Sequence, residues 1–477
     1  MIVGLQMAGT ASFAIRSQRS LLSGADGALA RRDFSLQTNQ PVGKATWNRP
    51  HWMVTCFLIG LTIPWIIPLG PLNLSVYRLV LLAALLPCLL SWVRGELGFK
   101  LQDVALFLYS IWAAVALFAA HDSSAATQTS GIFFIETMGA YLLARRYIRN
   151  AADFRGMIFV VTMVVLALSP FAIYEWITGH KPILSTLRMI FPTVDVTMMT
   201  PRWGFWRVQG PFSHSIEFGL FCTSILALTH LAWGHGCNSA SRWLLTAGVA
   251  GTAFLSMSSA PISCLFLQVV LMAYTAILWR NNSKWMILWS IILVGFLAAQ
   301  LGSNQGAVKF FISHFTFDPQ TGWYRVAIWD FGSESVVNHP WLGIGLADWQ
   351  RPRWMPSDSV DNFWLLTAMR YGIPALVPLM GSFILTIVAV TCAKSADRTV
   401  EICRVAYVIC MVTFLFVGTT VHFAHAIYSW FIFAWGSGVW LMDTELPKLA
   451  RTAESNLPTR DRLLPRGNAR QQSRAWN

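Results

Sequence analysis

Charged side chains are scarce in this chain. They make up only 12% of its 477 residues, whereas hydrophobic residues make up 55%, and an ordinary soluble domain is about a quarter charged. This shortage excludes a soluble globular protein. Lys and Arg number 35 against 22 Asp and Glu, but they stand in short stretches beside apolar segments, where they set membrane orientation. The positive balance therefore does not indicate nucleic-acid binding.

Cysteines with metal-ligand spacing are also missing. Seven of the eight cysteines fall in or at the ends of apolar segments, and Cys237 lies in a short connection. This pattern predicts packing residues rather than a zinc site or a disulfide framework. The first predicted outside loop, near 70–75, has no Asp or Glu that could hold a divalent cation. Asp358 and Asp361 are two carboxylates alone, which is a weak metal signal, so we expect no metal and no other cofactor.

The amino-terminal segment lacks the features of a signal peptide. Residues 1–50 contain no apolar run long enough to span a membrane, and no charged stretch precedes their short apolar patch. We expect a disordered, basic cytoplasmic arm there, and a disordered, basic cytoplasmic tail at 444–477. The Arg-rich, acid-poor composition of the arm is also similar to that of an organellar transit peptide.

Apolar stretches fill the chain between these ends. Residues 51–443 hold one stretch after another with a length near the ~20 residues that a helix needs to cross a bilayer. The stretches lie near 52–68, 76–93, 102–120, 129–148, 156–178, 214–234, 243–258, 260–279, 285–301, 363–391, 403–421 and 424–442. They predict an all-α integral membrane protein with about 12 transmembrane helices.

The basic residues predict the orientation of these helices. With the amino terminus inside, the cytoplasmic segments hold about 25 of the 35 Lys and Arg, and the outside segments hold about eight. Both termini are therefore expected to be cytoplasmic. Two long periplasmic loops result, at 179–213 and, between spans 9 and 10, at 302–361. Aromatic residues among polar ones in the second loop favour short amphipathic helices at the membrane surface.

Polar residues that could carry chemistry cluster in and beside these loops. The segment RVQGPFSHSIEFG places Arg207, His214 and Glu217 close together at the start of span six. In the second loop, Arg325 and Trp329 would share one face of a helix.

The remaining signals follow further along the second loop. A Pro and Gly-rich turn contains Pro340, Gly343 and Gly345, and Asp361 and Asn362 open the next span.

These segments, in this order, resemble the O-antigen ligase and polymerase family, which includes exopolysaccharide polymerases. The resemblance covers roughly 207–375. It rests on an Arg before a middle span, an Arg ahead of a Pro-x-x-Gly-x-Gly turn, and a polar pair with a Gly downstream. The matching residues are Arg207, Arg325, Pro340, Gly343, Gly345, Asp361, Asn362 and Gly372. Ligases of the family typically have His-Asn at the polar pair, so the Asp-Asn pair here favours the wider family over a ligase acting on lipid A core.

The resemblance implies a membrane glycosyltransferase in a bacterial inner membrane. Such an enzyme polymerises or ligates saccharides carried on undecaprenyl pyrophosphate, using a saccharide acceptor at the periplasmic face, in contact with membrane lipid. Arg207 and Arg325 would hold the pyrophosphate, since a guanidinium donates paired hydrogen bonds to phosphate oxygens. Asp361 would activate or orient the acceptor hydroxyl, with His214 and Glu217 in reserve.

Further binding roles are expected for two neighbours of these groups. Trp329 and Asn362 are candidate substrate contacts. Because nearby arginines lower the pKa of a carboxyl whose ordinary pKa is about 3.9, Asp361 is expected to orient more than to accept a proton.

Structural roles compete with these functional ones. The two arginines would also suit anchors to lipid phosphates, Asp361-Asn362 would suit a helix cap, and His214 would suit a core histidine at a helix start. Arg78 and Glu136 lie inside predicted spans, either as a buried pair or near the span ends, and they are not chosen as site residues. A 12-span secondary transporter or flippase is the alternative function, although no internal repeat is evident.

Overall fold

The structure is a computed structural model that describes residues 46–69, 72–281, 283–304, 306–314, 319–355, 357–393 and 395–443. The expected tail lies outside these residues, and so does nearly all of the expected amino-terminal arm. The elements below belong to one unit, Trp47–Asn477.

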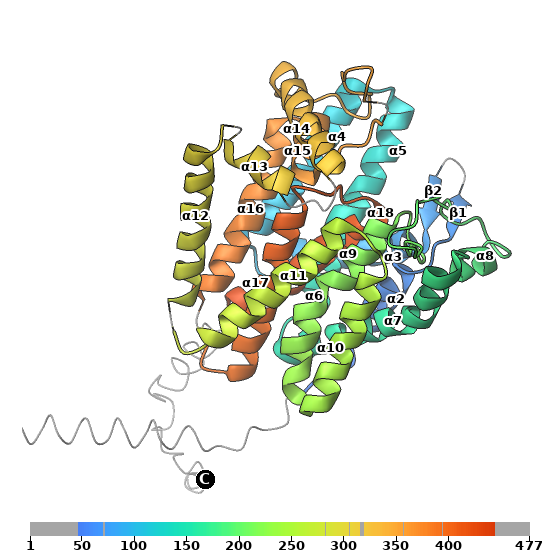
Figure 1. The fold of residues 1–477 in the computed structure, drawn as a ribbon. Helices are drawn as coiled ribbons and strands as arrows, with labels where there is room; N and C mark the ends of the chain where they lie inside the picture. Colours follow the sequence, from blue (N-terminus) through green and yellow to red (C-terminus); the bar gives the residue numbers. More distant parts are fainter. Residues whose placement is uncertain are drawn as a thin grey trace, which may run out of the picture. The chain divides into compact units, whose positions relative to one another are not determined.

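Helices make up the first half of this unit, apart from one small hairpin (Figure 1). The elements are α2 (Trp52–Gly60), β1 (Ile66–Leu69), β2 (Leu72–Ser75), α3 (Val76–Val93), α4 (Leu101–Ala120), α5 (Ser123–Phe134), η1 (Ile135–Gly139), α6 (Ala140–Tyr147), α7 (Ala151–Thr178), α8 (Pro182–Leu187), α9 (Ser215–Ser224), η2 (Leu228–Trp233) and η3 (Gly234–Gly236).

The second half is helical throughout its described elements. They are α10 (Ser239–Phe254), α11 (Ser259–Ile277), α12 (Lys284–Gly302), α13 (Gly306–His314), α14 (Pro319–Asn338), α15 (Phe363–Tyr371), α16 (Ile373–Cys392), α17 (Arg398–Val417), α18 (His425–Ser437) and η4 (Val439–Met442). The prediction of an all-α membrane protein is confirmed. Helices suit a membrane because each one satisfies its backbone hydrogen bonds internally in lipid.

Eight helical segments in the described chain are long and apolar enough to cross a membrane. They match eight of the 12 predicted spans. The other four coincide with helices that are short, such as α2 and α18, or interrupted, as where the π-helix η1 separates α5 from α6. The count of 12, the orientation and the periplasmic side of the loops stay predictions.

The first predicted span, 52–68, is wrong in its second half. Helix α2 ends at Gly60, and β1 then pairs antiparallel with β2, with Ile66 opposite Ser75. Pro64 and Pro68 explain the difference, because proline has no backbone N–H and clashes with the preceding helical turn. Length and apolarity alone therefore overestimated this helix.

The predicted span 363–391 agrees with α16 over its second part only, because Gly372 separates α15 from α16. Gly372 has φ +80°, a left-handed value that favours glycine, and a Cβ there would lie 2.0 Å from the carbonyl oxygen of Trp341. The chain reverses at this point. The rings of Trp364 and Phe383 lie 5.9 Å apart, so α15 runs antiparallel beside α16. The amino terminus of α15 is consequently turned into the helical bundle.

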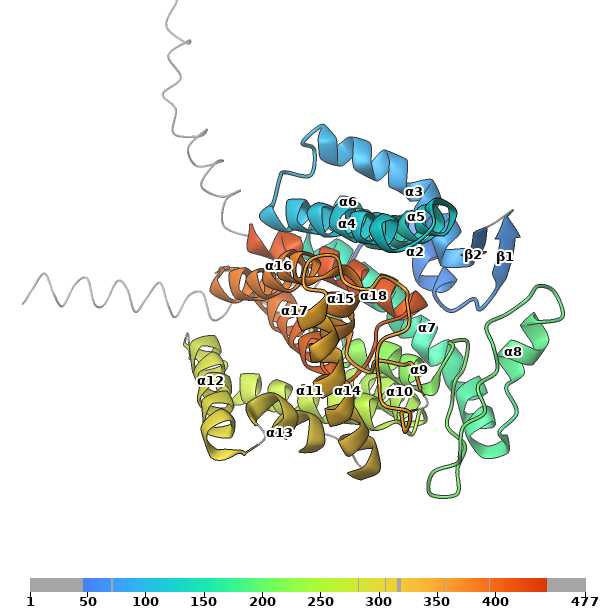
Figure 2. The ribbon, with the colours of Figure 1, turned by 90° about the horizontal axis from the view of Figure 1, so that it is seen from above.

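Helix α18 lies at the centre of the bundle. Every residue of α18 except His425 is buried, and Trp430 and Trp435 are fully enclosed. In contrast, α12 stands at the edge of the unit in both ribbon views (Figures 1 and 2), and most of its apolar residues are exposed. An apolar surface of this kind suits contact with lipid.

Both long loops are tied to the helices. In the first, the backbone around Pro192 and Val194 bonds to the chain just before β1, which holds α8 near the hairpin (Figure 2). In the second, the chain forms helices, as predicted, but only α13 is short, since α14 has 20 residues. A cluster of apolar residues packs α14 and the following loop against α15: Ala327, Ile328, Trp349, Met355, Val360, Leu365, Leu366 and Met369.

Candidate functional site

The end of the first loop is held by a buried carboxylate. The side chain of Glu175, in α7, accepts hydrogen bonds from the backbone N–H of Gln209 at 2.7 Å and of Gly210 at 3.1 Å. The buried amide of Gln209 in turn donates to the carbonyls of Phe212 and Ser213. These bonds fix the segment that follows Arg207, so its guanidinium has a defined position.

Two arginines of this loop reach the turn between α10 and α11. Arg202 Nη1 donates to the carbonyl of Met257 at 2.9 Å, and Arg207 Nη2 donates to Ser258 Oγ at 3.0 Å. Met257 has φ +47°, an uncommon value for a residue with a side chain. Burial and the charge of Arg202 lower the pKa of Arg207 to about 10. Two cations are thus held side by side.

A third arginine comes from α14. Arg325 is 5% exposed, and its Nε lies 4.0 Å from Asp361 Oδ2. Within the described chain, Arg325 Nε and Nη1 are buried and have no hydrogen-bond partner, and the same is true of Arg207 Nε. Burial lowers the pKa of Arg325; the charge of Asp361 opposes this shift and that of Arg202 adds to it. The structure therefore brings Arg325 and Asp361 together and links both predicted arginines to Arg202.

Sequence reasoning missed Arg202, although it lies only five residues before Arg207. Its signal was available, because it is one of the few cations of the predicted outside loops. Below, Arg202, Arg207, Arg325 and Asp361 are called the arginine cluster.

The two residues of the polar pair Asp361-Asn362 have different roles. Asn362 is the cap of α15, and its Oδ1 accepts from the backbone N–H of Leu365 at 3.0 Å. Asp361 instead faces Arg325. Burial raises the pKa of Asp361 above its ordinary value, and Arg325 and Ser359 only partly offset that rise. The expectation of a lowered pKa is wrong, because neighbouring charge was considered without desolvation.

The other predicted contacts have mainly local partners. His214 caps α9, its Nδ1 accepting from the N–H of Ile216 at 3.2 Å, and burial with the charge of Arg207 lowers its pKa to about 4. Glu217 is buried and accepts from the N–H of Ser213 at 3.2 Å. His214 thus lies beside the arginine cluster, whereas Glu217 supports the loop.

Trp329 lies one helical turn after Arg325. It is half-buried against the apolar cluster between α14 and α15, so it supports the helix that carries the arginine.

The predicted glycine turn closes the other end of α15. Gly343 and Gly345 have φ of +64° and +63°, and the N–H groups of Ile344 and Gly345 donate to the carbonyls of Met369 and Arg370. Those carbonyls lie in the last turn of α15 and have no partner within the helix. The turn therefore stabilises the short helix that begins at Asn362.

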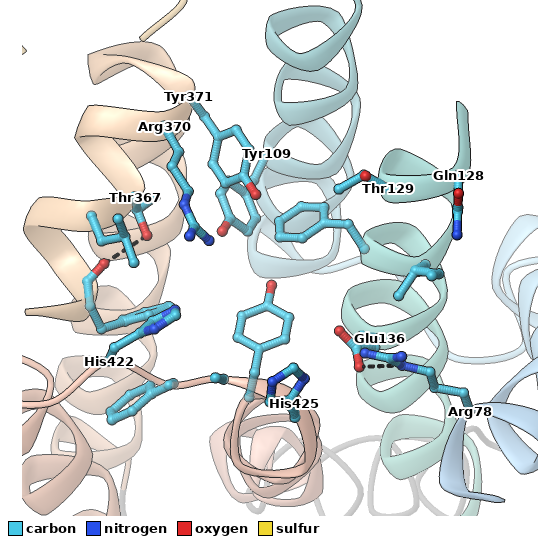
Figure 3. Close-up of a pocket in the computed structure, with 17 residues that line it drawn as sticks. Arg78, Tyr109, Gln128, Thr129, Glu136, Thr367, Arg370, Tyr371, His422 and His425 are labelled. Carbon is cyan, nitrogen blue, oxygen red and sulfur yellow. Dashed lines mark hydrogen bonds and ion pairs between the residues drawn. The ribbon is translucent and has the colours of Figure 1, made fainter. Parts of the chain in front are cut away.

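A second polar site lies on another face of α15 and was not chosen from the sequence. It is a cavity of about 420 Å³. Figure 3 shows charged and imidazole side chains from α3, η1, α15 and the start of α18 around it. They are Arg78, Glu136, Arg370, His422 and His425. Their signal was charge or imidazole inside apolar stretches, which is expensive in a membrane and indicates function.

Among the described residues, no group of three or more His, Cys, Asp and Glu side chains could hold a metal ion. The donors that converge in the arginine cluster are mostly cationic, and they suit an anionic substrate.

One comparison with known proteins finds a similarity in the central part of the chain. Residues 244–380 match the family model described as O-antigen ligase. The matched region runs from α10 into α16 and includes Arg325, Asp361 and Asn362, but it begins after the loop that carries Arg207. No curated protein matches the chain. The match supports an enzyme of the O-antigen ligase and polymerase type that acts on saccharides.

Proposed function

We propose that this protein is a membrane glycosyltransferase, since residues 244–380 match the family model described as O-antigen ligase. It polymerises or ligates saccharides carried on undecaprenyl pyrophosphate, at the periplasmic face of a bacterial inner membrane and without a metal ion. The observation that carries the proposal is the set of three buried guanidinium nitrogens without partners, Nε and Nη1 of Arg325 and Nε of Arg207.

Unpartnered buried donors are costly. Each buried donor without a partner costs about 1–3 kcal/mol, more when it is charged. The three donors belong to Arg325 and Arg207, and Arg202 adds a third cation. Together they create a strong preference for an anion with several acceptor oxygens. Pyrophosphate meets this need. Arginine suits the task better than lysine, because its planar fork donates in fixed directions and stays charged even where its pKa is lowered.

The arginines act on the leaving group. In the transfer, the acceptor hydroxyl oxygen attacks the anomeric carbon, and the bond from that carbon to the pyrophosphate oxygen breaks. Negative charge then grows on the pyrophosphate, where donors already in place stabilise the transition state more than the ground state. The lipid pyrophosphate leaves without needing a proton.

Asp361 takes the proton of the acceptor hydroxyl. Its side chain is 36% exposed, and its Oδ2 lies 4.0 Å from Arg325 Nε, so an acceptor oxygen can approach it next to the bound pyrophosphate. Burial raises its pKa, which makes the carboxylate a stronger base than an ordinary Asp. The proton passes to water after the product leaves.

Surface polysaccharide and lipid-linked intermediates from cells lacking this protein test the proposal. The cells are complemented with wild type, with Arg325→Ala, or with Arg353→Ala, a change at an exposed arginine of the same loop. We expect Arg325→Ala to lose long chains and Arg353→Ala to keep them.

The intermediate that accumulates separates the activities. Single repeat units on the carrier indicate a polymerase, and long unattached lipid-linked chains indicate a ligase. Full product from Arg325→Ala and from the matching Arg207→Ala would refute the proposal. An unchanged outer face in cells without the protein would favour a transporter or flippase.

A further inference from the structure

The cavity on the second face of α15 is built for a ligand. Its volume of about 420 Å³ lies within the range of small-molecule sites. Its wall includes η1, a π-helix between α5 and α6, and π-helical turns occur frequently at functional sites. His425, at the start of α18, has φ +48°. These are local departures from regular helix on two sides of one cavity.

One cation of the cavity is already neutralised. Arg78 Nε lies 2.9 Å from Glu136 Oε1, and the hydroxyl of Tyr77 donates to the same oxygen at 2.7 Å. This pair closes one side of the cavity, as Figure 3 shows. Arg78 therefore adds no net charge to a ligand site.

The other cation has no anionic partner. Arg370 stands in the last turn of α15, with its guanidinium directed toward the middle of the cavity (Figure 3). In the described chain, no carboxylate lies within ion-pair distance of it, and Glu136, the one acidic residue lining the cavity, is paired with Arg78. Burial and the charge of Arg370 lower the pKa of His422 to about 3, so that imidazole is neutral at physiological pH. The cavity presents one net positive charge.

Aromatic rings form much of the remaining wall. They come from α4, α5, α15, α18 and the segment that leads into α18, and they are Tyr109, Phe133, Phe363, Tyr371, Phe423 and Tyr428. The rings of Phe133 and Tyr428 stack with centroids 5.8 Å apart. Flat rings pack against the apolar faces of a sugar ring, while Thr129 and Thr367 offer hydroxyls for hydrogen bonds. One cation among rings and hydroxyls matches a sugar with one acid group.

We infer that this cavity binds an acidic sugar residue of the saccharide substrate, with Arg370 paired to its carboxylate. The inference rests on the proposed function. A carboxylate fits better than pyrophosphate because a single unpaired cation balances a single negative charge, whereas the arginine cluster holds three arginines against one carboxylate. The eight residue steps from Phe363 to Tyr371 correspond to about 12 Å along α15. The acid group would therefore lie away from the bond that forms beside Asp361.

The test is ligand binding to the full chain in lipid nanodiscs, measured by saturation-transfer NMR. The probes are glucuronate, glucose and the methyl ester of glucuronic acid, which differ at one carbon. Only glucuronate carries a charge there. Wild type should bind glucuronate at least about tenfold more tightly than either neutral probe. Arg370→Gln should remove this difference, and Arg353→Gln should leave it unchanged.

A second pair of variants keeps the test clear of folding defects and of the proposed chemistry. Arg370→Lys keeps the charge and should retain part of the preference. Arg325→Gln should abolish transfer but bind glucuronate as wild type does, and inorganic pyrophosphate should not displace the sugar from that variant.

Three results would overturn the inference: equal binding of all three probes to wild type, an undiminished preference in Arg370→Gln, or displacement of glucuronate by pyrophosphate. None of these results bears on the proposed function, which fails separately if the variants at Arg325 and Arg207 both still give full product.

Discussion

Replacing Arg325 by methionine should abolish catalysis without weakening the fold. The Nε and Nη1 groups of Arg325 are buried and have no hydrogen-bond partner in the described chain, and we expect both to donate to pyrophosphate. A hydrogen bond to a charged group contributes about 1.5–3 kcal/mol. Two such bonds, realised fully only in the transition state, contribute about 3–6 kcal/mol, so kcat/KM should fall by roughly 10²- to 10⁴-fold.

Thermal stability should move in the opposite direction. Without substrate, the two buried donors of Arg325 each cost about 1–3 kcal/mol. The ion pair with Asp361 offsets little of this, because it is 4.0 Å long and its carboxylate is 36% exposed. Methionine fills a similar volume without polar atoms, so the melting temperature of the substrate-free protein should stay equal or rise by a few degrees.

The assay is polymer formation from purified lipid-linked saccharide, scored by the chain-length ladder on gels and by release of lipid pyrophosphate. Thermal unfolding of the same preparation gives the stability, and Arg353→Gln is the matched control. Activity within a fewfold of wild type would refute the role of Arg325 at pyrophosphate. A melting temperature lowered by many degrees would show that Arg325 stabilises the fold instead.

Four further predictions follow from the same geometry. Gly372→Ala should unfold or inactivate the protein, because its Cβ would lie 2.0 Å from the carbonyl oxygen of Trp341. Normal thermal stability and activity would contradict the chain reversal between α15 and α16. Asp361→Asn should lower kcat at least about 100-fold, and the acid limb of the wild-type pH profile should lie above the pKa of an ordinary Asp, since burial raises this pKa; an unchanged profile in Asp361→Asn would exclude it as the base. The pKa of His214 falls to about 4 on folding, so protonation of His214 should lower the stability of the protein as the pH drops from about 6.5 to 4. His214→Asn retains a capping side chain and should flatten that pH dependence in thermal scans. An equally steep loss of stability in the variant would point to another group. Chelator should leave polymer formation unchanged, and loss of product that Mg²⁺ restores would overturn metal independence.

The helices of the second half show which features of the fold can be predicted from the local sequence. The predicted stretches at 260–279 and 285–301 agree with α11 and α12 within a few residues, because apolar length and backbone hydrogen bonding are properties of neighbours in sequence. The turn at Gly343 and Gly345 was predictable for the same reason. The failure at Gly372 is instructive, since apolar residues continue on both sides of it and only packing against Trp341 reveals the reversal.

The sequence predicted which residues belong to the candidate site, but it did not predict their burial or their contacts. Arg325 and Asp361 were found by motif, but their ion pair depends on how α14 packs against the start of α15. The pKa of Asp361 illustrates the limit, because burial is a property of the surrounding fold and opposed the expectation from neighbouring charges.

The sequence by itself determined that this is a helical membrane protein with basic segments between its spans and polar residues concentrated in two loops. Tertiary structure alone decided that Arg202 would join the arginine cluster, and that Arg78, Glu136 and Arg370 would line one cavity. Helices form through contacts within a few residues, whereas Glu136 and Arg370 are separated by about half of the chain. Both line the cavity only because η1 and α15 pack around α18, which no local pattern encodes.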